Sequence, residues 1–276
     1  REMLTEIRLH TRAKACRLEL WQGRPRLFRH CGDQPMHTSL HPVVFSGDTM
    51  TDVDRAYNVV RKELAEVGLL AEGKYLDQIE LWISDRPSEG ESAYIFEAPG
   101  PWVSKGYKPG VIYLPSDTPN VPNLPGLTLI DVIRHEFAHA WYYIDPKFFR
   151  EDWFVRTFGA QYKNCNPRAL EAWKRQLQNN FEYQMRLARC RSEETRKKLY
   201  RKLLYKNFVS GYASNCACED FAETFMFFLK YRNSLDRFVE SRPVVYQKLK
   251  SVERAVNKTA RRLRSSRTTT WRVLSA

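Results

Sequence analysis

The stretch Arg134-His135-Glu136-Phe137-Ala138-His139-Ala140-Trp141 contains the pattern H-E-x-x-H, the strongest chemical signal in the chain. On a helix, side chains four residues apart leave the same face, so His135 and His139 project together. Two neutral imidazoles at this spacing can bind one Zn²⁺ ion, and Glu136 is then placed to act on water as a general base. The alternative is a buried helix in which both histidines are ordinary packing residues.

The flanking sequence predicts that this motif lies on a buried helix with marked ends. Thr128 and Asp131 match a capping box at its start. Asp145 precedes Pro146 and marks its end, because the residue before proline avoids the α region. The segment is apolar nearly all round, as expected for a buried helix, through Leu129, Ile130, Val132, Ile133, Phe137, Ala138, Ala140 and Trp141.

A catalytic zinc site needs a third protein ligand and one open position. No histidine follows His139, so we expect a carboxylate from a second helix. Glu219 and Glu223 stand at i and i+4 in an otherwise apolar segment, where carboxylates are rare unless they are paired or bound to metal. We expect Glu219 to ligate the zinc and Glu223 to accept a hydrogen bond from a ligating imidazole. A half-exposed carboxylate pair without a ligand is the alternative.

These two stretches resemble motifs of the zincin metallopeptidases. Residues 135–140 match the first motif of that family, and residues 219–225, with Tyr212 seven residues ahead of them, are similar to the second. The similarity is to the branch with a Glu ligand, which includes the catalytic domain of anthrax lethal factor and predicted bacterial zinc peptidases. It covers two short stretches and one tyrosine.

The resemblance implies a zinc-dependent endopeptidase that hydrolyses a peptide or protein substrate. It implies that zinc is held by His135, His139 and Glu219. Glu136 would be the general base and Tyr212 a donor to the oxyanion. Glu223 would contact one of the zinc ligands rather than the zinc itself. Such a protease could also act as a toxin or effector inside a target cell.

Hydrophobic periodicity predicts an α+β fold, with a small mixed sheet packed on a mostly helical zinc-metallopeptidase domain. We expect an N-terminal extension with a small β element over residues 1–46, the domain over 47–263 and a basic tail over 264–276. Helices are predicted at 51–67, 128–144, 167–185, 193–206, 219–232 and 243–263, and strands at 15–21, 26–28, 78–83, 93–96 and 110–114. The strand at 111–114 could pair with an extended peptide along a sheet edge, or it could be a plain strand of the sheet.

Charge is distributed unevenly along the 276 residues, whose 43% hydrophobic content is typical of a globular protein. Residues 1–146 hold 16 Lys and Arg against 20 Asp and Glu, whereas residues 147–276 hold 29 against 12. The basic residues alternate with apolar ones at helical spacing, which favours solvated helix faces. They also suit an acidic partner or nucleic acid, so the alternative function is a nucleic-acid-binding protein with a structural zinc site.

The cysteines show no recognisable disulfide framework and do not identify a compartment. Cys216 and Cys218 are predicted to be too close in sequence to pair with each other. A second zinc site is conceivable near the N-terminus, although its residues lack a C-x-x-C pair: Cys16, Cys31, His37 and His41. No signal peptide is recognisable, and no apolar run approaches the ~18 residues of a membrane span.

Overall fold

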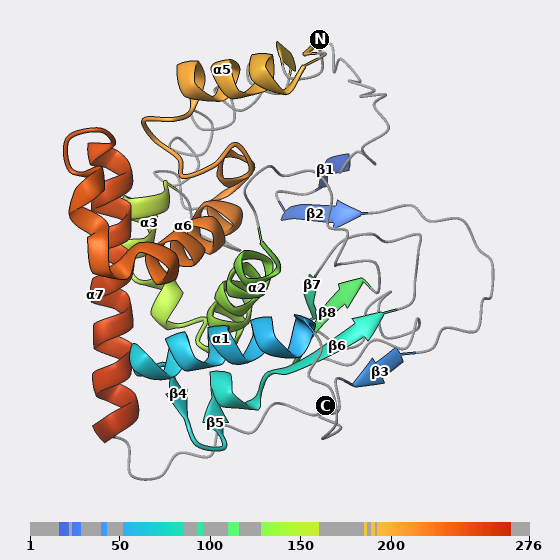
Figure 1. Cartoon of the computed structure of the whole chain (residues 1–276), viewed down its shortest axis with the longest axis vertical. Helices are drawn as coiled ribbons and strands as arrows, with labels where there is room; N and C mark the ends of the chain where they lie inside the picture. Colours follow the sequence, from blue (N-terminus) through green and yellow to red (C-terminus); the bar gives the residue numbers. More distant parts are fainter. Residues whose placement is uncertain are drawn as a thin grey trace.

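A computed structural model of the chain describes residues 17–21, 24–28, 40–42, 52–84, 93–95, 110–115, 128–159, 185–186, 189–190 and 192–265. The described part is mostly helical and carries a small mixed sheet, which confirms the predicted α+β class. Helix α2 (Leu129–Ile144) lies in the middle and contacts α1, α6 and the sheet (Figure 1). Among the described residues, no helix has the length and apolarity to cross a bilayer.

Apart from α3, which was not predicted, the helices agree with the predicted ones to within a few residues. They are α1 (Asp52–Glu66), α2, α3 (Asp152–Phe158), α5 (Glu193–Leu203), α6 (Ala217–Tyr231) and α7 (Pro243–Ser265). Short 3-10 turns connect them at η1 (Leu76–Gln78), η4 (Phe148–Arg150), η5 (Tyr212–Ser214) and η6 (Arg232–Phe238). Nearly all of the helix predicted at 167–185 lies outside the described residues.

The sheet has the strand order β3–β6–β8–β7. Strands β6 (Glu80–Ser84) and β8 (Val111–Pro115) pair in parallel, while β3 (Leu40–Pro42) and β7 (Ala93–Ile95) add antiparallel strands on either side. Strand β3 lies within residues 1–46, the predicted N-terminal extension. Part of that extension therefore belongs to the sheet of the main domain. The boundaries at 46 and 263 otherwise stay predictions.

Strand β8 corrects one expectation about substrate binding. Segment 111–114 could be a peptide-binding edge or a plain sheet strand, and the structure supports the second, because β7 pairs with Val111–Tyr113 on one side and β6 pairs along the other. Edge pairing by β8 is therefore wrong, because both of its hydrogen-bonding sides are occupied. The outer strands among those described are β3 and β7, and β7 contacts α2.

Two small β elements complete the described strands. The predicted N-terminal hairpin is present, with β1 (Arg17–Trp21) antiparallel to β2 (Arg24–Phe28). A second, two-stranded element joins β4 (Leu70–Ala71) to β5 (Lys74–Tyr75) directly after α1.

Aromatic side chains fix the crossing of α2 and α6, the two helices that carry both sequence motifs. Trp141 of α2 lies 5.4 Å from Phe225 between ring centroids, and Phe149 lies 4.8 Å from Phe221. All four side chains are buried. Such aromatic pairs contribute roughly 0.5–1.5 kcal/mol each beyond the burial of their area. The relative position of the two motifs is therefore set by a tightly packed core.

Polar contacts hold the start of α2 in place. The predicted capping box is confirmed, since Thr128 Oγ1 accepts from the Asp131 amide and Asp131 accepts from the Thr128 amide. Lys230 of α6 lies 2.7 Å from Asp131, and Arg134 pairs with Asp131 and with Glu63 of α1. These charges are partly or fully buried but mutually paired, so they orient α2 against both neighbouring helices.

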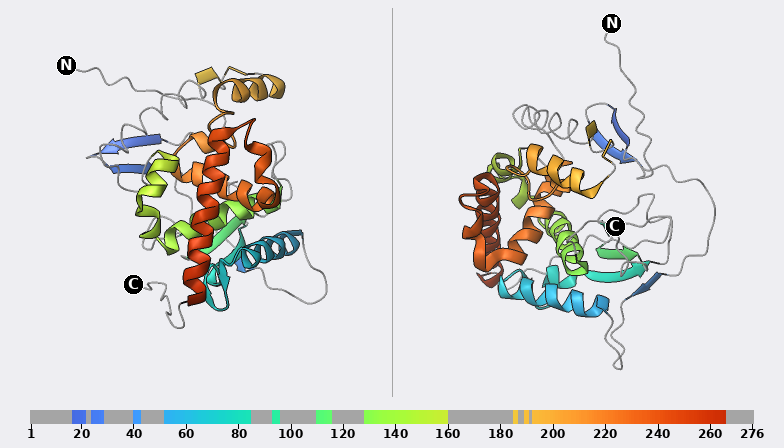
Figure 2. Two further views of the ribbon diagram at one scale, coloured as in Figure 1. Left: turned by 90° about the vertical axis from the view of Figure 1, so that its left-hand side faces the viewer. Right: turned by 45° about the horizontal axis from the view of Figure 1, so that its top comes forward.

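Gly68 follows α1 and lets α7 approach closely; Figure 2 shows these two helices from two further directions. Its φ of +77° is in the left-handed region that favours glycine after a helix. A Cβ added there would lie 2.8 Å from Cβ of Ala260 on α7. The predicted helix end is thus confirmed, and the glycine has a packing role in addition to its backbone role.

Candidate metal centre

Helix α2 brings the two motif histidines together, with their rings in an edge-to-face arrangement. Their Nε2 atoms lie 3.0 Å apart, and their ring centroids lie 4.8 Å apart. His135 is buried, with 8% of its surface exposed, and His139 is partly buried. One turn of helix separates them, so the i, i+4 spacing produces the convergence that was predicted.

Glu219, in the first turn of α6, completes a group of three ligand atoms. Its Oε2 lies 3.1 Å from Nε2 of His135 and 3.5 Å from Nε2 of His139. This oxygen is buried and accepts no well-angled hydrogen bond from the described residues. Ligand atoms about 2.0–2.1 Å from a tetrahedral zinc would be about 3.3 Å from one another. The separations of 3.0, 3.1 and 3.5 Å fit that requirement, so this group could hold a metal ion.

The electrostatics of the group favour a cation among these atoms. Burial acts to raise the pKa of the Glu219 carboxyl, but His139 and His135 outweigh it and hold the pKa well below its usual range. Burial acts to lower the pKa of His135, but the neighbouring carboxylates of Glu219 and Glu223 raise it well above the usual value. Positive charge at His135 is therefore stabilised, and the same carboxylates would stabilise a divalent cation.

Glu223 lies behind His135, one turn beyond Glu219 on α6. Nδ1 of His135 lies 2.8 Å from Oε1 of Glu223, and Oγ of Ser210 donates to Oε2 of Glu223 at 2.6 Å. When Nδ1–H donates to this carboxylate, the Nε2 lone pair faces Glu219 and His139. The structure thus places Glu223 where the sequence predicted it.

Ser210 is a site residue that the sequence did not single out. Besides donating to Glu223, its Oγ accepts from the amide of Ala213 at 3.0 Å. It therefore connects the carboxylate behind His135 to the η5 turn that carries Tyr212. A lone serine in a loop has no motif, and its position two residues before Tyr212 was the only available signal.

The two remaining predicted residues are next to His135, Glu136 in the sequence and Tyr212 in space. Glu136 follows His135 on α2 and is buried, with 5% of its surface exposed. Tyr212 opens η5, and its ring centroid lies 5.8 Å from that of His135. At 46% exposure, Tyr212 is at the rim of the site with access to solvent. A buried carboxylate and a rim phenol can supply a base and a hydrogen-bond donor to a bound carbonyl compound.

Cys216 and Cys218 correct a second expectation, because the structure pairs them in a disulfide. Their Cα atoms lie 5.4 Å apart, within the range that a disulfide requires. The reason is local backbone geometry: Cys216 is the extended N-cap of α6, and the chain turns into the helix immediately after it. The proposed second zinc site at Cys16, Cys31, His37 and His41 lies outside the described side chains.

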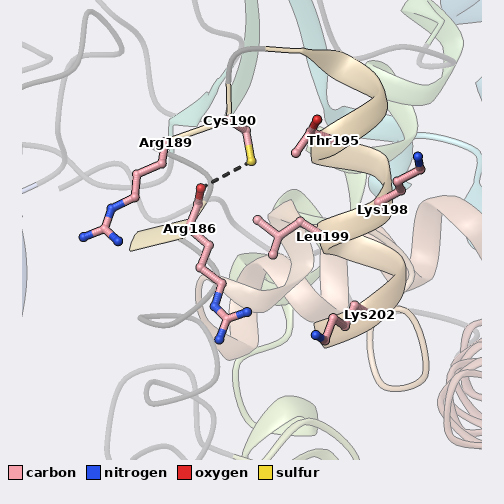
Figure 3. Close-up of a pocket in the computed structure, with 7 residues that line it drawn as sticks. All are labelled: Arg186, Arg189, Cys190, Thr195, Lys198, Leu199 and Lys202. Carbon is pink, nitrogen blue, oxygen red and sulfur yellow. Dashed lines mark hydrogen bonds between the residues drawn. The ribbon is translucent and has the colours of Figure 1, made fainter.

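A cavity of about 420 Å³ beside α5 is lined by none of the metal-centre residues. Figure 3 shows Leu199 reaching from α5 toward the segment that carries Arg186 and Cys190, with Arg189 pointing away from it. The lining includes four exposed cations: Arg186, Arg189, Lys198 and Lys202. These four exposed cations belong to the basic C-terminal half of the chain, residues 147–276.

Comparison of the chain with protein-family models, with curated proteins and with solved structures gives no match. The chemical case for the site therefore depends on its own geometry: two imidazoles and a carboxylate that converge, with a carboxylate behind one imidazole.

Proposed function

We propose that this protein is a zinc-dependent endopeptidase. The observation that carries the proposal is the convergence of His135 Nε2, His139 Nε2 and Glu219 Oε2 beside the buried Glu136. Two nitrogen ligands and one carboxylate, with a fourth position open, form a common ligand set of catalytic zinc sites. A purely structural zinc site would instead be closed by a fourth protein ligand.

Each residue then has a defined part in peptide hydrolysis. When bound, a zinc ion supplies a Lewis acid and lowers the pKa of a bound water to about 7. Glu136 accepts a proton from the attacking water and passes it to the leaving amine. The phenol of Tyr212 donates to the developing oxyanion, a contact worth roughly 3 kcal/mol when one such donor is removed. Glu223 and Ser210 hold His135 in the required tautomer.

Strand β7 supports an extended peptide as the substrate. It is one of the two outer described strands of the sheet, with β3, and it contacts α2, the helix that carries Glu136. An unpaired strand edge can hold a peptide through main-chain hydrogen bonds. A peptide bound there would run beside α2, which is consistent with cleavage within a chain.

The Glu136→Gln variant tests the proposal. It should retain one zinc per chain but lose peptide hydrolysis by at least about 10³-fold, because the amide cannot accept the proton of water. Glu194→Gln on α5, an exposed glutamate (65%), provides a matched control that should keep full activity. Unchanged proteolysis by Glu136→Gln would rule out its role as the base.

The second candidate function is nucleic-acid binding with a structural zinc. It is favoured by the exposed cations around the cavity beside α5, namely Arg186, Arg189, Lys198 and Lys202. Metal-loaded protein should then bind DNA or RNA with an affinity that falls steeply as salt rises, and should cleave no peptide. The two functions are distinguished by combining this salt titration with the Glu136→Gln assay.

A further inference from the structure

The two oxygens of Glu219 face different groups. Oε2 faces the imidazoles of His135 and His139, whereas Oε1 lies 3.9 Å from Sγ of Cys218. The sulfurs of Cys216 and Cys218 and a Glu219 carboxylate oxygen all lie within 4.8 Å of one another. All three side chains are partly exposed, so ions and small molecules can reach them. A second set of metal-ligating atoms thus adjoins the first and shares one carboxylate with it.

We propose that, in the reduced protein, Cys216, Cys218 and Glu219 Oε1 form a second site for a thiophilic divalent cation such as Zn²⁺ or Cd²⁺. Soft thiolates select such ions, and two sulfurs with one oxygen leave a fourth position for water. With Zn–S bonds of about 2.3 Å, both sulfurs on one ion would be about 3.8 Å apart. Cα atoms 5.4 Å apart allow that spacing. Glu219 would then bridge two cations through its separate oxygens.

The disulfide makes this second site dependent on redox state. In the structure the two sulfurs are bonded to each other, so neither is a thiolate that can ligate an ion. The site is lost when a low-molecular-weight disulfide oxidises the two cysteine thiols by thiol–disulfide exchange. The Cys216–Cys218 bond forms, the S–S bond of the small disulfide breaks, and the two thiol hydrogens pass to its two sulfurs. The proposal goes beyond the proposed peptidase activity and does not depend on it.

Titration of the full chain with Co²⁺ tests the proposal without an activity assay. Reduced protein should bind two Co²⁺ per chain and show a thiolate-to-cobalt charge-transfer band. In Cys216→Ser/Cys218→Ser that band should be lost and the stoichiometry should fall by one. Cys190→Ser, at a free cysteine outside the site, is the matched control and should behave as wild type. The same band and the same stoichiometry in the double variant would overturn the proposal.

The wild-type chain provides a second measurement that needs no variant. Alkylation of the reduced protein, followed residue by residue by mass spectrometry, should slow at least about 10-fold at Cys216 and Cys218 when Zn²⁺ is added, but not at Cys190. Equal alkylation rates with and without Zn²⁺ would contradict the second site.

The variant His139→Ala distinguishes the two metal sites, because it should lose the first cation and keep the thiolate-to-cobalt charge-transfer band. Loss of that band together with the first cation would contradict an independent thiolate site.

Discussion

Glu219 and Asp220 are adjacent carboxylates on α6 that face opposite environments. Glu219 faces the imidazoles of α2, whereas Asp220 is fully buried against α7, with Nζ of Lys248 2.5 Å from its Oδ2. The histidines hold the pKa of Glu219 well below its usual range. Burial raises the pKa of Asp220 to about 6, even though Lys248 acts in the other direction. One residue step along a helix turns a side chain by about 100°, enough to move it from a site into the core.

The difference separates a carboxylate that could hold a metal ion from one that is paired within the core. Glu219 has a buried oxygen without a good hydrogen bond, which suits a ligand that binds an added cation. Asp220 has its partners within the fold, because Lys248 also donates to the Asn207 carbonyl and Thr224 donates to Asp220. Substitutions at Glu219 should therefore act on metal binding, and substitutions at Asp220 or Lys248 should act on folding.

The largest expected effect is that of Glu219→Gln on zinc affinity. Removal of one of three ligands should weaken zinc binding on the order of 10³-fold or more, since structural zinc sites bind with about 10–16 kcal/mol from four ligands. Competition with a chromogenic chelator measures the loss. Asp220→Asn, one residue away, is the matched comparison and should keep its zinc. Wild-type zinc affinity in Glu219→Gln would refute its role as ligand.

Lys248→Met should produce the largest loss of stability. Removing one partner of a buried ion pair leaves Asp220 uncompensated and should cost about 3–5 kcal/mol of unfolding free energy. Urea unfolding in the presence of chelator measures this cost. Lys258→Met breaks an exposed pair with Glu151 and should cost less than about 1 kcal/mol. If both variants lose equal stability, the buried pair has no special structural role.

The raised pKa of Asp220 predicts a pH dependence of stability. The folded protein holds this proton up to about pH 6, whereas the unfolded chain releases it near 3.8. The contribution is therefore fully present below pH 3.8 and lost as pH rises through 6, with an upper limit of roughly 3 kcal/mol. Relative to Asp220→Asn, the wild type should lose unfolding free energy between pH 4 and pH 6. A difference between the two proteins that stays constant with pH would contradict this account.

The smallest expected effect is that of Ser210→Ala, which removes the hydrogen bond to Glu223. Loss of a contact behind a metal ligand typically lowers metal affinity or activity by about 10- to 100-fold. We expect the lower end, because Glu223 itself stays in place against His135. Ser241→Ala, at an exposed serine in the turn between η6 and α7, should change neither quantity. Zinc affinity and peptide hydrolysis of Ser210→Ala equal to those of Ser241→Ala would show that Ser210 has no positioning role.

Local sequence determined much of the candidate site. Helical spacing alone places His135 beside His139 and Glu219 on the same face as Glu223. The capping box at Thr128 marks the start of α2 because it depends on residues only three apart. Each of these predictions involves contacts within one or two turns of a single helix, where backbone geometry dictates the relative position of side chains.

Tertiary structure decided what lies between distant segments. The crossing of α2 and α6, fixed by Trp141 and Phe225, brings Glu219 to the histidines and turns Asp220 toward Lys248. Strand pairing placed β8 inside the sheet and left β7 outside. Ser210 gained its role through a loop that packs on Glu223. These outcomes depend on packing between distant segments and on the backbone conformation where the chain enters a helix. Hydrophobic periodicity gives no information about either.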